Sequence, residues 1–196
     1  MLEAARRLFA TRGYAETRID DIAAEADVSV PTVYATFQSK RGVLDALIHR
    51  LAAGVPGGTP LVDTAGPRAV NAEPDARRAL SMFVEHLLGV QERVIPTYEV
   101  MKSAARTEPE IAELLRKTQQ QRYANLSTLA ARLSELDVLR AGVSVEDASR
   151  TLWAITSPEV RQMLLDGAGW TIDKYRAWLE DTLVAVLLVQ QSRRRK

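Results

Sequence analysis

Hydrophobic positions in this chain recur every three to four residues and almost never alternate with polar ones. A spacing of i, i+3, i+4 and i+7 places side chains on one face of an α-helix, whereas strict alternation would indicate a β-strand. The segments 19–26, 75–94 and 108–136 all follow the helical spacing. The sequence therefore predicts an all-α fold with about nine helices.

Residues 17–40, TRIDDIAAEADVSVPTVYATFQSK, predict two short helices joined by a tight turn. Thr17 followed three residues later by Asp20 is a capping pattern for the first helix. Asp27 lies at the turn, where aspartate tolerates a left-handed backbone, and Ser29 is a strong N-cap for the second helix. Two helices joined in this way form a helix-turn-helix, whose second helix enters the major groove of DNA.

The second helix is predicted to expose a small, uncharged face. At about 100° per residue, Val33 and Phe37 point inward, and the opposite side carries short side chains that can approach base edges closely. Thr32 offers a hydroxyl and a methyl group to bases, and Tyr34 can reach a phosphate. Ser39 caps the following helix, whose N-terminal amides and first lysine form a phosphate site. The residues predicted to contact DNA are Ser29, Pro31, Thr32, Tyr34, Ala35, Thr36, Ser39 and Lys40.

The order LEAARRLFATRGY followed by TRIDDIAAEADVSVPTVYATFQSKRGVLDALI resembles the DNA-binding domain of the TetR family of one-component transcriptional regulators. The resemblance covers residues 2–48, with the first helix, both helix-turn-helix helices and the TVYATFQSK signature in register. It implies that Thr32, Tyr34 and Lys40 occupy positions that contact DNA in the family. It also implies a helical C-terminal domain that binds a small-molecule effector and forms a homodimer.

Two features depart from the family pattern. Asp27 stands at the turn position that glycine usually holds, which the backbone tolerates. Met1 falls almost inside the first helix, whereas family members usually carry a basic segment before it. Either the native start lies upstream, or the protein lacks an N-terminal arm for additional contacts to DNA.

Composition narrows the class of protein. The chain has 196 residues, enough for one compact domain or two small ones, and it contains no cysteine. No N-terminal segment has the layout of a secretion signal, and the longest apolar run, 183–189, is too short to span a bilayer. These features predict a soluble cytoplasmic protein.

Charge predicts a modest electrostatic attraction to DNA. The formal net charge is +1, and residues 1–53 hold equal numbers of basic and acidic residues. We therefore expect few phosphate contacts per subunit and a shallow salt dependence. The tail Arg193–Lys196 is basic and is interpreted mainly as a solvated chain end.

The rest of the chain divides into a loop and a second helical domain. Residues 54–74 are rich in Gly and Pro and predict a flexible loop between a DNA-binding domain at 1–53 and an effector-binding and dimerisation domain at 75–192. Pro96 is predicted to break the helix that starts at Asp75, with a short helix following it.

The last helix, predicted from Ile172 to about Gln191, is apolar on more than one side. One side can pack within its own domain and another against a second chain, which gives a homodimer and a roughly palindromic operator. The alternative is that all of these residues pack in the core of a single chain. The residues predicted for the dimer interface are Trp153, Tyr175, Trp178, Leu179, Leu183, Val186 and Leu187.

Aromatic, methionine and polar residues in the middle of the second domain are candidates for a mostly apolar effector site. They are Tyr98, Glu99, Met101, Tyr123, Trp153, Thr156 and Met163. Each of these residues, taken singly, is also compatible with plain core packing.

Catalysis and metal binding have no support in the sequence. The two histidines, His49 and His86, have no metal-ligand spacing with each other or with a cysteine, and no phosphate-binding glycine loop follows a strand. We therefore expect no enzyme, no metal and no cofactor. The main alternative to a regulator is a helical protein-interaction adaptor that keeps the helix-turn-helix as a scaffold.

Overall fold

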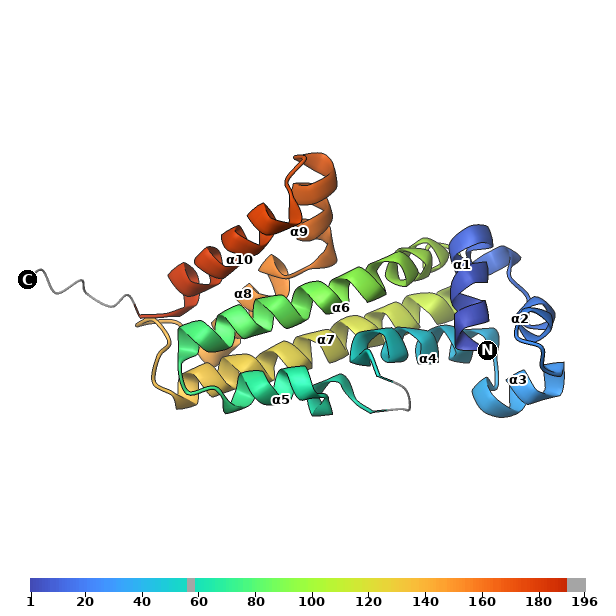
Figure 1. Cartoon of the computed structure of the whole chain (residues 1–196), viewed down its shortest axis with the longest axis horizontal. Coiled ribbons are helices and arrows are strands. Elements are labelled where there is room, and N and C mark those ends of the chain that lie inside the picture. Colours follow the sequence, from blue (N-terminus) through green and yellow to red (C-terminus); the bar gives the residue numbers. More distant parts are fainter. Residues whose placement is uncertain (56–58, 190–196) are drawn as a thin grey trace, which may run out of the picture. The chain divides into compact units, whose positions relative to one another are not determined.

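A computed structural model describes residues 1–55 and 59–189, and the predicted basic tail lies outside these residues. Within them the chain forms ten α-helices, one short 3₁₀ helix (Leu61–Asp63) and one π-helical turn (Met163–Gly167) (Figure 1). No β-strand occurs in the described residues, which have one isolated bridge, between Leu139 and Leu188. The predicted all-α class is confirmed. The helices are α1 Leu2–Glu16, α2 Ile19–Glu25, α3 Val30–Phe37, α4 Lys40–Ala53, α5 Ala65–Ala72, α6 Ala76–Ala104, α7 Pro109–Glu135, α8 Val145–Ile155, α9 Pro158–Gln162 and α10 Ile172–Leu187.

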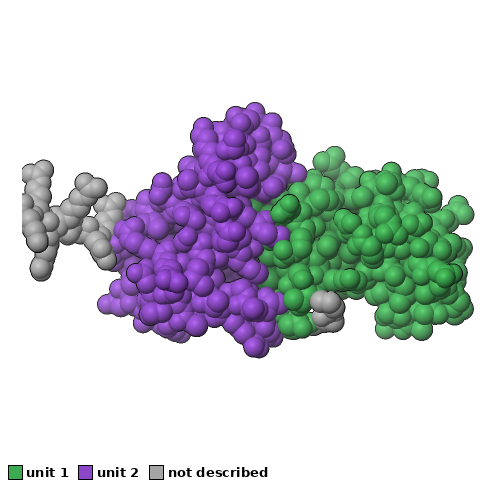
Figure 2. All heavy atoms as spheres, in the orientation of Figure 1, with its two compact units in different colours: residues 1–61, 90–119 green, residues 62–89, 120–196 purple. Residues whose placement is uncertain are grey.

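The chain separates into two compact units, coloured differently in Figure 2. Unit 1 holds residues 1–61 and 90–119, and unit 2 holds residues 62–89 and the chain from 120 onward. The helices α6 and α7 each contribute residues to both units. The domain boundaries predicted at residues 54–74 remain a prediction, because compactness alone does not define where a domain can fold independently.

Unit 1 has a single apolar core that the helix-turn-helix shares with parts of α6 and α7. Phe9 and Tyr14 of α1, Ile22 of α2 and Val33 of α3 are almost fully buried in it. The buried residues of α4, α6 and α7 complete the same core; they are Val43, Leu44, Leu47, Ile48, Tyr98, Met101, Ala104, Ile111 and Leu114. A helix of eight residues such as α3 has little stability of its own, so this core holds it in place.

Unit 2 is built around the inner side of α10. Tyr175, Leu179, Leu183 and Leu187 lie four residues apart, so they fall along one stripe, and each has 0% exposed surface. They pack with buried residues of α5 to α8, namely Val70, Ala76, Ala79, Leu80, Val84, Leu88, Leu126, Leu129, Ala130, Leu133, Ala148 and Leu152.

The start of α2 differs from the prediction. Thr17 does not cap it: Thr17 is buried, and its hydroxyl donates to the Gly13 carbonyl oxygen at 2.7 Å. Arg18 is the N-cap residue, and its backbone N–H donates to the Asp21 carboxylate at 3.1 Å. The capping pattern is therefore shifted by one residue, because the backbone turns at Gly13 (φ 77°) and carries Thr17 back onto α1.

Two further segments differ from the prediction. The predicted loop contains α5, whose Val70 is buried in the core of unit 2. Pro96 lies inside α6 and does not end it. An interior proline costs a helix roughly 3 kcal/mol. The residues beside it, Ile95, Thr97 and Tyr98, are buried, so tertiary packing outweighs that cost.

Candidate nucleic-acid interface

The turn and the cap before α3 are as predicted. Asp27 adopts a left-handed backbone with φ 52°, and the Thr32 N–H donates to Ser29 Oγ at 3.3 Å. The N-cap bond satisfies one of the backbone donors that a helix start leaves open. Local chemistry thus fixes where α3 begins, and the core of unit 1 fixes which side faces inward.

The inner and outer sides of α3 also agree with the prediction. Val33 is fully buried, and Val30 and Phe37 are partly buried against the same core. All the predicted base-reading and flanking positions of α3 are exposed: Pro31, Thr32, Tyr34, Ala35 and Thr36. The Tyr34 side chain, at 50% exposure, is the most accessible large residue of the helix. The structure therefore brings these residues together on one uncharged surface.

Hydrogen bonds within α3 orient its hydroxyl groups. Ser29 Oγ and Thr32 Oγ1 lie 2.7 Å apart, and Thr36 Oγ1 donates to the Thr32 carbonyl oxygen at 2.9 Å. A hydroxyl has one hydrogen and two lone pairs, so each keeps acceptor capacity for a further partner. Because the Thr36 hydrogen is already used, Thr36 can meet DNA as an acceptor or through its methyl group.

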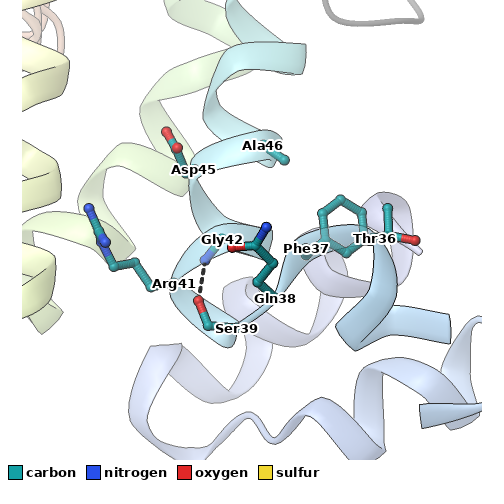
Figure 3. A pocket seen from close by; sticks show the side chains of 8 residues that line it. All are labelled: Thr36, Phe37, Gln38, Ser39, Arg41, Gly42, Asp45 and Ala46. Carbon is teal, nitrogen blue, oxygen red and sulfur yellow. Dashed lines mark hydrogen bonds between the residues drawn. The ribbon is translucent and has the colours of Figure 1, made fainter. Parts of the chain in front are cut away.

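The junction between α3 and α4 forms a pocket of about 350 Å³, whose lining side chains are drawn in Figure 3. Ser39 Oγ accepts from the Gly42 N–H at 3.0 Å, which confirms its predicted role as the N-cap of α4. A Cβ atom at Gly42 would collide with the Phe37 carbonyl oxygen, so this close approach requires glycine. The residues lining the pocket are Thr36, Phe37, Gln38, Ser39, Arg41, Gly42, Asp45 and Ala46.

Gln38 and Gly42 line this pocket, and the sequence pattern did not predict that they belong to the surface around α3. Gln38 ends α3 with φ 65°, a conformation that favours glycine. A glycine three residues after an N-cap serine was the available signal for a close backbone approach at Gly42.

Lys40 has partners that the sequence did not predict. Its ammonium donates to the carbonyl oxygens of Tyr14 at 2.8 Å and Ala15 at 3.3 Å, and it lies 4.2 Å from the centre of the Tyr14 ring. Burial raises the pKa of the Tyr14 phenol above its ordinary value, and the Glu110 carboxylate raises it further. The phenol therefore stays protonated and donates to Glu110 at 3.5 Å.

Acidic residues of α2 are paired with arginines of α1. Arg7 contacts Glu25 at 2.9 Å, and Arg12 contacts Asp21 at 3.6 Å. All four side chains are at least one third exposed, so the pairs add little stability. They pair two of the four carboxylates of α2 and the turn before α3 with positive charges, and Asp20 and Asp27 are the other two.

The residues predicted for an effector site are divided between the two units. Tyr98 and Met101 are buried in the core of unit 1, and the Tyr98 hydroxyl accepts from Gln119 Nε2 at 3.3 Å. Glu99 is partly exposed and pairs with Lys102 at 3.1 Å. Plain core packing therefore accounts for Tyr98 and Met101 in the described structure.

The other four predicted effector residues belong to unit 2. Thr156 is fully buried, and its hydroxyl donates to the Leu152 carbonyl oxygen at 2.7 Å while accepting from Arg122 at 2.8 Å. Trp153 is 39% exposed, Met163 is 66% exposed and Tyr123 is partly exposed. These residues include accessible apolar surface, but Thr156 already has both a donor and an acceptor.

Four of the residues predicted for the dimer interface need correction. Tyr175, Leu179, Leu183 and Leu187 have no exposed surface within their own chain, so they cannot contact another chain directly. Their stripe is the inner side of α10. Trp153, Trp178 and Val186 keep exposed surface and remain candidates.

The described residues hold neither a cluster of metal-binding side chains nor a helix long and apolar enough to cross a membrane. The exposed, uncharged outer side of α3 and its supporting core have the arrangement of a helix-turn-helix. Residues 1–47 match the family model of bacterial regulatory proteins of the tetR family. No curated protein matches the chain.

Solved structures share the fold over nearly the whole chain. The TetR family transcriptional regulator PfmR from Thermus thermophilus is 25% identical with a TM-score of 0.63, covering 97% of this chain and 98% of its own. A chain from Saccharomonospora viridis in complex with choline is 24% identical with a TM-score of 0.70, covering 96% of both. SmeT in complex with triclosan is 19% identical with a TM-score of 0.74, covering 96% of this chain and 90% of its own. SmeT is the repressor of the Stenotrophomonas maltophilia multidrug efflux pump SmeDEF. The chain thus has a TetR-type helix-turn-helix and the fold of TetR-family transcriptional regulators.

Proposed function

We propose that this protein is a cytoplasmic, non-enzymatic transcriptional repressor that binds a specific DNA sequence as a homodimer and releases it when a small, mostly apolar effector binds. The observation that carries the proposal is the exposed, uncharged outer side of α3, set on a buried inner side. Such a face fits the major groove without carboxylates to repel phosphates. The family match of residues 1–47 supports the same assignment.

Sequence reading is assigned to the small residues of α3. Thr32 contacts base edges through its hydroxyl and methyl groups, and Pro31 and Ala35 contact thymine methyl groups. Tyr34, Ser29 and Ser39 bind backbone phosphates around them. Thr36, whose hydroxyl hydrogen is held by the Thr32 carbonyl oxygen, meets DNA through its methyl group. No arginine stands on this face, so specificity rests on close apolar fit and on DNA shape.

Dimerisation is assigned to the accessible parts of α8 and α10. Trp153, Trp178 and Val186 supply apolar surface that the described chain leaves partly uncovered. A two-fold interface presents two copies of α3 to successive major grooves, which matches a palindromic operator. The buried stripe of α10 packs in the core of unit 2 and so holds the exposed residues of this helix in place.

The effector is assigned to the helical domain. Two structures with the same fold hold small organic molecules, choline in one and triclosan in the other. Tyr123, Trp153 and Met163 of unit 2 offer aromatic and thioether surface for a mostly apolar compound, and Thr156 of the same unit offers a hydroxyl. Release of DNA requires that the effector bind one of two conformations more tightly than the other.

Selection of DNA by the full-length protein tests the proposal. Duplexes of roughly 30 base pairs with random sequence are bound at low salt, recovered and sequenced over several rounds, beside fragments of the region upstream of the protein's own gene. We expect enrichment of one site with two-fold symmetry and half-sites about one helical turn apart. Recovery of random sequence with no enrichment would favour the adaptor alternative.

A screen of small molecules by thermal shift tests the effector assignment. A compound that raises the melting temperature should also reduce binding to the selected duplex. Stabilisation without any change in DNA affinity would contradict effector control.

A further inference from the structure

Lys40 is the first residue of α4, and its charged group is turned toward the interior of the protein. Both carbonyl oxygens that it contacts, those of Tyr14 and Ala15, belong to the last turn of α1. Both residues follow the kink at Gly13, so these carbonyl oxygens belong to a short turn and not to a continuous helix. The Tyr14 oxygen also accepts from the Thr17 N–H at 3.3 Å, and its second lone pair is available to the ammonium. The bond to Tyr14 is partly buried.

The Tyr14 ring adds a third favourable contact for the same ammonium. The ring is 3% exposed and packs against Phe9, with ring centres 5.6 Å apart. A cation over a buried aromatic face is attracted by the ring electrons and is shielded from water. Two of the three N–H groups of the Lys40 ammonium donate to carbonyl oxygens. If the ammonium moved away to bind a phosphate, both oxygens would lose this donor.

The contact of Lys40 with Tyr14 and Ala15 lies between the segment before α2 and the segment after α3. The last turn of α1 leads through Thr17 into Arg18, the N-cap of α2. Lys40 follows Gln38 and Ser39, which connect the end of α3 to α4. The contact therefore joins the entry of the helix-turn-helix to its exit.

We infer that Lys40 is a positioning residue for DNA binding, a clamp that ties the end of α1 to the start of α4 and so fixes α2 and α3 between them, and that it is not a phosphate ligand. The inference rests on the proposed DNA-binding function. It replaces the role that the family resemblance implies for this position. The phosphate site at the start of α4 is then formed by Ser39 and the backbone amides alone.

Three variants test the clamp in the full-length protein with the duplex recovered by the selection described above. Lys40→Met removes the charge, Lys40→Arg keeps donors and a cation, and Tyr14→Leu removes the ring. Arg50→Met is the control, because Arg50 is an exposed residue near the other end of α4 and its loss lowers the charge by the same amount.

We expect Lys40→Met to weaken binding about tenfold at a temperature where every variant remains folded. The slope of log affinity against log salt should stay unchanged, because each phosphate contact contributes roughly 0.9 to it. Lys40→Arg should restore affinity to within about threefold. Adding Lys40→Met to Tyr14→Leu should cost less than the sum of the two single changes, because both remove the same contact.

A slope that falls by about one with Lys40→Met, and not with Arg50→Met, would show a direct phosphate contact and overturn the inference. A lower melting temperature with unchanged DNA affinity would also overturn it, since Lys40 would then only stabilise the fold. If Tyr14→Leu fails to fold, Tyr14→Phe with its ring retained should leave the effect of Lys40→Met intact.

The clamp and the proposed function can fail separately. If the unaltered protein selects no duplex, the DNA-binding function fails. The melting temperatures of Lys40→Met, Tyr14→Leu and the double variant still measure their coupling without DNA. Independent, additive shifts would overturn the clamp whatever the protein binds.

Discussion

Helix α3 and the last helix, α10, differ in how much of their surface is buried. Only Val33 of the eight residues of α3 is fully buried, and its outer side is small, uncharged and exposed. Four residues of α10 are fully buried in one stripe. The chemistry of α3 is therefore directed outward, and that of α10 is directed mainly into its own unit. Substitutions should accordingly separate function in α3 from stability in α10.

The largest effect is expected from Leu183→Ala in α10. Truncating a fully buried leucine removes apolar contacts and leaves a cavity, which costs about 2–5 kcal/mol of unfolding free energy. Urea denaturation measures this loss, and Asp181→Ala on the exposed side of the same helix is the control. A change below about 1 kcal/mol would mean that the helix is held by contacts other than this stripe.

Gly42→Ala should have the next largest effect. The added methyl group collides with the Phe37 carbonyl oxygen, so the turn between α3 and α4 must shift, at a cost of roughly 1–3 kcal/mol. The shift should also weaken DNA binding, because this turn carries the end of α3. Gly167→Ala, where a Cβ meets no atom within 4 Å, should change neither quantity. Equal behaviour of the two variants would contradict the close approach.

Thr32→Ala should change which DNA sequence is preferred while leaving stability nearly constant. The exposed side chain makes few packing contacts, but loss of a base contact changes discrimination by about 1 kcal/mol at one position of each half-site. Tyr34→Phe is the contrasting variant, since loss of a phosphate contact weakens all sequences alike. Repeating the selection with each variant measures both effects. An unchanged preference with Thr32→Ala would count against base reading by Thr32.

Gln38→Gly should give the smallest change, a gain in stability of roughly 0.5–1 kcal/mol. Gln38 holds a positive φ of 65°, which glycine adopts without a Cβ penalty. Thermal unfolding measures the gain. A loss of stability would show that contacts of the glutamine side chain outweigh its backbone strain.

Short-range chemistry explains what the sequence predicted well. The cap at Ser29 and the turn at Asp27 depend on neighbours within a few residues. The inward side of α3 follows from the helical spacing of its apolar residues, Val33 and Phe37. The prediction that Thr17 caps α2 is wrong because the chain bends at Gly13, before Thr17. A capping pattern depends only on the residues of the helix start and does not predict such a bend.

Long-range packing explains what the sequence did not predict. The uniform apolar character of α10 could not show which residues face their own unit, so four core residues were assigned to an interface. The contact of Lys40 with Tyr14 spans 26 residues and becomes visible only once α1 and α4 are packed together. Helix α5 has one buried residue, Val70, so its sequence shows no apolar stripe that would predict a helix.

Under the proposed DNA-binding function, the pairing of Arg7 with Glu25 and of Arg12 with Asp21 affects how the protein reaches its operator. Arginines that are paired with carboxylates displace few counterions from non-specific DNA. Complexes with non-specific DNA should therefore be short-lived. Competition from the many non-cognate sites is then weak, and most molecules stay free to reach the operator. We therefore expect that a small number of copies per cell is sufficient to keep the operator occupied.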